Sequence, residues 1–252
     1  MTRPRALFAA LALLFLAGGS ADAARPVVAD LSNHLVAITT GFSGTHVLVF
    51  GATDERKGDI VMVVRGPQET HVVREKTRLA GVWMNRTEAY FQQVPAFYAV
   101  AATAPLDSIV PSEVRKHHQI GVEALELPAT DSDGRALPAA QARRFREALV
   151  RLKSRAGLYP GGLGNVTTLE NRLFRAELDL PATVPVGSYT VEVFFVQDGG
   201  VIGAEITPLF VSKTGFSAEV FDFAMYHAVQ YALAAIAFAA LSGWGIALVF
   251  RR

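Results

Sequence analysis

The feature that most constrains this chain is an uncharged run near its C-terminus. From Ala228 to Phe250 there are 23 residues without a single Asp, Glu, Lys or Arg. A helix of that length measures about 35 Å, enough to cross a hydrocarbon core of about 30 Å with some tilt. A core helix this long and this apolar is unusual in a small domain. We therefore predict a transmembrane helix over residues 226–250.

The residues beside this run predict its orientation. Arg251 and Arg252 follow it immediately, and the positive-inside rule places such a pair in the cytoplasm. Tyr226 and Tyr231 lie near the opposite end of the run, where aromatic rings favour the membrane interface. The tail of residues 251–252 is thus expected inside the cell, with the rest of the chain outside.

The N-terminus predicts a secretory signal peptide over residues 1–23. Arg3 and Arg5 precede the apolar segment Ala6–Ala17, and Ala21-Asp22-Ala23 has the small residues that signal peptidase needs. An uncleaved N-terminal anchor is the alternative, although the apolar segment is short for a span. Both ends therefore predict a single-pass membrane protein whose globular domain lies outside the cytoplasm.

The charge balance limits the partners of that outer domain. The whole chain has a net charge of +1, but four of its cations lie in the two ends. Without the ends, 20 basic and 22 acidic side chains remain. A nearly neutral surface argues against nucleic acid as a partner, because neutralising phosphates requires a basic patch. The chain has no Cys, so a packed core must stabilise it without disulfides.

The outer domain, residues 24–220, shows the pattern of a β-sandwich. Short apolar runs alternate with turn signals before and after a helical excursion at about 108–160. Leu173–Leu180 alternates strictly, and Gln197–Gly200 is a strong hairpin signal. Leu79–Met84 is expected to be a strand. We predict one immunoglobulin-like β-sandwich with a helical insertion; two small β domains are the alternative.

Two local patterns add detail. Pro185-x-Gly187-x-Tyr189 resembles the corner of immunoglobulin-like domains in which a Tyr hydroxyl bonds to the backbone upstream. Gln141–Leu158 is the clearest soluble helix. We expect its buried face to consist of four residues: Phe145, Leu149, Leu152 and Ala156. Its arginines are interpreted as a solvated face rather than a docking site for an acidic partner.

A search for chemistry finds no catalytic constellation. The sequence has no nucleophile elbow, no phosphate-binding loop and no dinucleotide fingerprint. His34 and His46 fall on neighbouring predicted strands, but no spacing typical of a metal site occurs. We therefore expect no enzyme activity, no cofactor and no metal.

Two sets of residues are candidates for binding partners. Arg65, Trp83 and Asn85 are predicted to cluster at strand ends, where Arg and aromatic residues act as interface hot spots or fill the core. A second set has small side chains at intervals of four residues in the predicted span, where another helix can approach closely. This small-residue ridge consists of Ala235, Ala239, Gly243 and Ala247.

Several blocks of the sequence resemble a proteobacterial family described as putative transmembrane proteins. These blocks are Ser32–Ala52, Gly58–Pro67, Leu79–Asn85, Val94–Ala101, Leu173–Pro181 and Val184–Phe195. The resemblance covers nearly the whole mature chain and includes the final Phe-Arg-Arg. It implies an inner-membrane protein with a periplasmic domain, and it implies no activity and no catalytic residues. It also implies a sulfite-exporter-like permease as a partner.

Together these observations predict an accessory module. A periplasmic domain held at the bilayer would assist an integral membrane partner such as a transporter. The alternative is a periplasmic domain that binds or senses a small solute, such as an anion or a metal ion.

Overall fold

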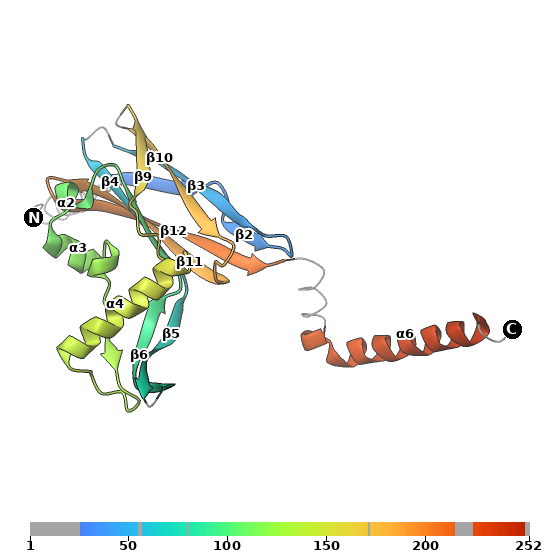
Figure 1. The fold of residues 1–252 in the computed structure, drawn as a ribbon. Coiled ribbons are helices and arrows are strands. Elements are labelled where there is room, and N and C mark those ends of the chain that lie inside the picture. The colour runs from blue at the N-terminus through green and yellow to red at the C-terminus, as the bar shows by residue number, and fades with distance from the viewer. Residues whose placement is uncertain (1–25, 55–56, 80, 171, 215–223, 250–252) are drawn as a thin grey trace, which may run out of the picture.

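The structure, a computed structural model, describes residues 26–249 apart from 55–56, 80, 171 and 215–223. The predicted signal peptide (residues 1–23) and Arg251–Arg252 lie outside the described residues. The described chain is mainly β, with short helices and one longer helix between Leu106 and Arg155, and it ends in the long helix α6 (Ala228–Val249) (Figure 1). The predicted mainly β class, the helical insertion and the C-terminal apolar helix are confirmed.

Nine described strands form one hydrogen-bonded sheet that draws on both halves of the chain. In spatial order they are β1 (Val27–Leu31), β3 (Gly44–Thr53), β10 (Leu173–Pro181), β9 (Gly164–Leu169), β7 (Tyr98–Ala102), β4 (Asp59–Arg65), β11 (Gly187–Gln197), β12 (Gly200–Lys213) and β2 (Leu35–Ile38). The pairs are antiparallel except β7–β9 and β12–β2. Strands that precede the helical insertion in the sequence are therefore interleaved, mostly in pairs, with strands that follow it.

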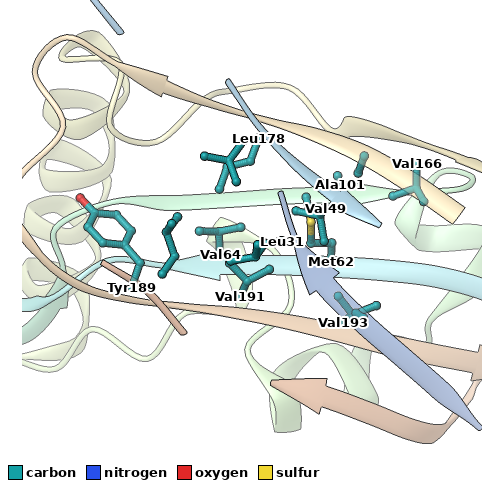
Figure 2. Packing of buried hydrophobic residues seen from close by; sticks show 14 of the residues in the cluster. Leu31, Val49, Met62, Val64, Ala101, Val166, Leu178, Tyr189, Val191 and Val193 are labelled. Atoms are coloured by element: carbon teal, nitrogen blue, oxygen red, sulfur yellow. The ribbon is translucent and has the colours of Figure 1, made fainter. Parts of the chain in front are cut away.

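The sheet curls on itself and encloses a first apolar core. Strand twist brings β1 back towards β12, where the Thr207 hydroxyl donates to the carbonyl of Ala29 at 3.3 Å. Figure 2 shows the two layers meeting: Leu31, Val49 and Leu178 face side chains from the other layer. Those opposing side chains include Met62, Val64, Val191 and Val193. Burial of these layers supplies the stability that disulfides cannot.

A second core covers the outer face of the same central strands. β4 is apolar from Ile60 to Val64, and its two sets of alternating side chains enter different cores: Ile60, Met62 and Val64 the first, Val61 and Val63 the second. The outer face is covered by seven further elements. They are α2 (Leu106–Ile109), α3 (Ser112–His118), the 3₁₀ turn η1 (Val122–Ala124), α4 (Ala139–Arg155), β8 (Ala129–Thr130) and the hairpin of β5 (Gln68–Leu79) and β6 (Val82–Pro95).

Two predicted local features are present. The Tyr189 hydroxyl donates to the carbonyl of Pro185 at 2.6 Å, closing the corner before β11. Asp198 and Gly199 form the turn between β11 and β12, both with positive φ (51° and 78°), as a tight hairpin turn requires. A wider likeness to immunoglobulin domains stays a prediction.

Two predictions of elements are correct only in part. Leu79–Met84 is not one continuous strand: Leu79 ends β5 and Val82 begins β6, and the two residues pair across the hairpin turn. The buried face of α4 consists of Phe145, Leu149 and Lys153, whereas Leu152 is 53 % exposed and Ala156 is also exposed. A lysine replaces the expected apolar residues because its aliphatic stem packs inside while its ammonium finds oxygen partners.

The shared central strands predict that both cores unfold together. Phe195 of the first core and Phe91 of the second are 1 % and 0 % exposed, so replacing either by Ala should cost about 3–5 kcal/mol. Phe50, which is 43 % exposed on β3, is the matched control and should change stability by about 0.5 kcal/mol or less. Urea unfolding of the full chain in detergent, followed by two spectroscopic probes, should give one transition for each variant. Two separate transitions for F91A would contradict the shared core.

Candidate functional site

The long helix α6 presents an apolar surface that is not buried against the rest of the described chain. It is the one described helix long and apolar enough to cross a membrane, and its span Ala228–Ile246 is 0 % buried (Figure 1). The Ser242 hydroxyl donates to the carbonyl of Phe238 at 2.7 Å, so this polar group is satisfied within the helix. Such a surface is suited to lipid or to another helix.

The small-residue ridge lies along this helix. Ala235, Ala239 and Gly243 are exposed, and a Cβ built at Gly243 would meet nothing within 4 Å. Ala247 continues the spacing of four residues within α6. The backbone on this face is therefore open to close approach by a second helix.

The residues Arg65, Trp83 and Asn85 do not come together. Arg65 ends β4, while Trp83 and Asn85 are exposed near the end of the β5–β6 hairpin. Trp83 pairs with Arg78, which is ten residues along β5 from Gln68, so roughly 30 Å of hairpin separates it from the sheet. The expected cluster is wrong, and Trp83, 65 % exposed, is not a core residue either.

Arg65 bonds to groups inside the domain. One guanidinium nitrogen pairs with the Glu192 carboxylate on β11, and the side chains of both residues are only about one-fifth exposed. The other nitrogen, Nη2, donates to the carbonyl oxygens of His118 at 2.7 Å and Gln119 at 3.3 Å. A cation at these carbonyls complements the C-terminal end of α3. Arg65 thus ties α3 to the sheet, and this favours a structural role.

Tyr98 completes the same junction, and the sequence analysis did not assign it a role. Its hydroxyl donates to the Gln119 carbonyl at 2.7 Å and accepts from the Gly121 amide at 2.8 Å. Burial raises the pKa of Tyr98 to about 12, so the hydroxyl keeps its proton. Gln119 has a left-handed backbone (φ 50°), which turns the chain between these two bonds.

A second unpredicted cluster surrounds Lys153. Its ammonium donates to the Ala96 carbonyl at 3.3 Å and lies 3.8 Å from Glu69 Oε2. His71 Nε2 lies 3.1 Å from the same carboxylate but makes no aligned hydrogen bond within the described residues. Burial lowers the pKa of Lys153, while Glu69 opposes that shift. Sequence periodicity could not predict this cluster, because its members lie on β5 and α4, which are far apart in the sequence.

A pocket of about 700 Å³ opens between α2, α3, η1 and α4. Its two cations already have carboxylate partners: Arg115 lies 2.8 Å from Asp107, and Lys116 lies 3.2 Å from Glu113. A buried atom, Arg115 Nε, has no hydrogen-bond partner among the described residues. A solute-binding function would be located here, and it stays a prediction.

The two histidines considered for a metal do not meet. The region before β2 places His34 beside Asp30, and β3 places His46 beside Asp179. β2 pairs with β12, whereas β3 lies between β1 and β10, so the assumed neighbouring strands are at different places in the sheet. Within the described ranges, no group of three or more metal-ligating side chains is found.

Comparisons with known proteins give one match. A model of the family described as "Putative transmembrane protein (Alph_Pro_TM)" matches residues 26–252. A search of curated proteins and a search of solved structures each found no match to the chain. The family match covers the β domain and the C-terminal helix together.

The Arg65 junction predicts a loss of stability when the guanidinium is removed. Arg65→Met keeps much of the side-chain volume but leaves the Glu192 carboxylate and the end of α3 unpaired. We expect a loss of about 2 kcal/mol in urea unfolding, less than for a fully buried pair because both groups retain some solvent. The double variant R65M/E192Q should recover part of it. R175M, at an exposed position on β10, is the control, and an equal loss there would contradict the junction.

The position of His71 predicts acid sensitivity. Burial, and then the neighbouring Lys153 ammonium, lowers the pKa of His71 from its usual 6.5, with Glu69 opposing. The unfolded chain therefore binds this proton more tightly, and stability present above pH 6.5 is lost as the pH falls from 6.5 towards the folded-state pKa. His71→Gln should flatten the dependence of unfolding free energy on pH below that value. At about pH 8 His71 is neutral in both states, so the change in unfolding free energy caused by H71Q at that pH reports only the change in packing. If the slope of unfolding free energy against pH below 6.5 is the same in H71Q and in the parent chain, the prediction is contradicted.

Proposed function

We propose that this chain, which belongs to the Alph_Pro_TM family of putative transmembrane proteins, is a non-enzymatic accessory module that α6 holds at a membrane. Its β domain lies in the periplasm of a bacterium, and α6 crosses the inner membrane once. The module assists an integral membrane partner, which we propose to be a transporter such as a sulfite-exporter-like permease.

The observation that carries this proposal is the exposure of α6. Twenty-two residues, Ala228–Val249, form a helix, and its span Ala228–Ile246 is 0 % buried against the described chain. Large apolar side chains exposed in this number cannot remain in water, because each would carry the cost of hydrating its surface. The bilayer removes that cost, and the family match extends through this helix.

The proposed orientation rests on the charges at the two ends. Arg251 and Arg252 favour the cytoplasmic side, and the signal-like N-terminus favours export of the domain. Both segments lie outside the described residues, so this orientation rests on the sequence alone.

The proposed contact with the partner is the small-residue ridge. In lipid, two helices gain little from the hydrophobic effect, so their association depends on close packing and on small side chains that permit it. Ala235, Ala239 and Gly243 offer such a face, and no described segment of this chain occupies it. A second transmembrane helix is therefore the proposed occupant.

Leucine substitutions on the ridge test this function. In the tagged full-length protein, A239L/G243L adds bulk where the partner helix would approach, and we expect co-purification of the integral membrane partner in mild detergent to be abolished. The control A237L/G245L makes the same two changes on the opposite face of α6 and should retain the partner.

The complex identified by mass spectrometry decides between these outcomes. A complex that survives A239L/G243L unchanged would contradict the ridge. Equal loss in both double variants would show that the substitutions act through the helix as a whole.

A further inference from the structure

The outer end of the β5–β6 hairpin extends away from the body of the domain. The base of the hairpin packs into the second core through Val73, Ala89 and Phe91. Its last polar link to the helices is the pair between Glu75 and Arg144, at 2.7 Å. Beyond that point lies the segment of residues 76–86, which we call the hairpin tip. Its strands pair with each other, and β8 reaches only as far as Tyr90 and Phe91.

The hairpin tip exposes large apolar side chains. Val82, Trp83 and Met84 are 62 %, 65 % and 52 % exposed. Successive residues of a strand point to opposite faces, so Trp83 lies on one face and Val82 and Met84 lie on the other. Both faces of this two-stranded ribbon therefore expose apolar surface to solvent, which is unfavourable. A ribbon of this kind is stable only against another surface.

The charges of the hairpin tip have one sign. Residues 76–86 contain three cations, Lys76, Arg78 and Arg86, and no acidic residue. No carboxylate of the described chain pairs with any of them; the contact found is from Arg78 Nε to the Gly81 carbonyl, at 3.3 Å. Arg78 lies directly across the ribbon from Trp83. This local excess of charge stands out because the whole outer domain is nearly neutral.

The hairpin leaves the sheet at the same end as the connection to α6. Arg65, at the end of β4, pairs with Thr190, and Gly187 at the start of β11 pairs with Val211 near the end of β12. A Cβ built at Gly187 would lie 2.8 Å from Pro67 Cγ, so the segment entering β5 touches this end. Figure 1 shows the β5–β6 hairpin extending from the body of the domain.

Chain length allows the hairpin tip to reach the membrane surface. Ten residues, 214–223, lie between the end of β12 and the helical residues 224–226, and ten residues span at most about 35 Å. The 12 residues of β5 extend about 40 Å. The bilayer that holds α6 is therefore within reach of the hairpin tip.

We propose that the hairpin tip docks on the surface of an anionic phospholipid bilayer, the one that α6 enters. Trp83 lies at the depth of the headgroups, where its ring has both apolar and polar surroundings. Lys76, Arg78 and Arg86 bind the phosphates, and Val82 and Met84 enter the acyl boundary. The domain then has two attachments to the membrane, which fix its orientation. This surface requires no protein partner and is independent of the ridge on α6.

Fluorescence of Trp83 tests the docking directly. The full chain with W244F retains Trp83 as its single tryptophan and is placed in lipid nanodiscs that carry brominated acyl chains. We expect emission shifted to shorter wavelength and quenched by bromine when phosphatidylglycerol is present, with much less quenching in pure phosphatidylcholine. K76Q/R78Q/R86Q should lower the ratio of docked to undocked protein by roughly fivefold for each cation removed.

Two controls separate the hairpin tip from the rest of the domain. R143Q/R151Q/R155Q removes the same charge from exposed positions of α4 and should leave Trp83 quenching unchanged. A tryptophan placed by I206W on β12, in a W83F/W244F chain, should emit as in water, since Ile206 is 62 % exposed and lies on a strand outside the hairpin.

The contrary results are distinct. Trp83 emission as in water in both lipids would overturn the proposal. A blue shift without bromine quenching would show that protein covers Trp83, which also overturns it. Equal quenching in both lipids would overturn the role of the cations. Because the nanodiscs contain no other protein, none of these results depends on the partner of α6.

Discussion

Exclusion of water from every residue between Ile60 and Val64 is the constraint on which the rest of this domain depends. A strand that is apolar on both faces needs an apolar layer on each side. The curled sheet supplies one layer and the helical insertion with the base of the hairpin supplies the other. The insertion between the two β halves is thus required by the core. With no Cys in the chain, this double burial provides the stability of the domain.

The same strand positions the surfaces that we propose for function. At its end, Arg65 binds Glu192 and the last carbonyls of α3, so the insertion is linked to the sheet by charge as well as by packing. Three residues later, at Gln68, the chain enters β5, and the hairpin begins at the end of the sheet where β12 ends. The hairpin tip and the tether to α6 therefore share one end of the domain. We propose that this end of the domain is the side that faces the membrane.

Sequence patterns were reliable where the relevant forces are local. The turn at Asp198-Gly199 and the bond from Tyr189 to Pro185 involve residues a few positions apart, and both were predicted. The buried face of α4 was predicted only in part, because Lys153 is buried through oxygen atoms on another segment. Trp83 was expected near Arg65 because both residues lie close in sequence to strand ends. The long pairing of β5 with β6 separates them.

The sequence by itself determined the apolar helix α6 and the mainly β class, because uncharged length and β-forming runs are properties of contiguous residues. Only the tertiary structure decided which strands are neighbours. It placed β10 between β3 and β9, and β4 between β7 and β11, which bring together residues more than a hundred positions apart. It also left the hairpin tip outside both cores. Such pairings depend on which apolar faces fit one another across the whole chain, and no local pattern records that fit.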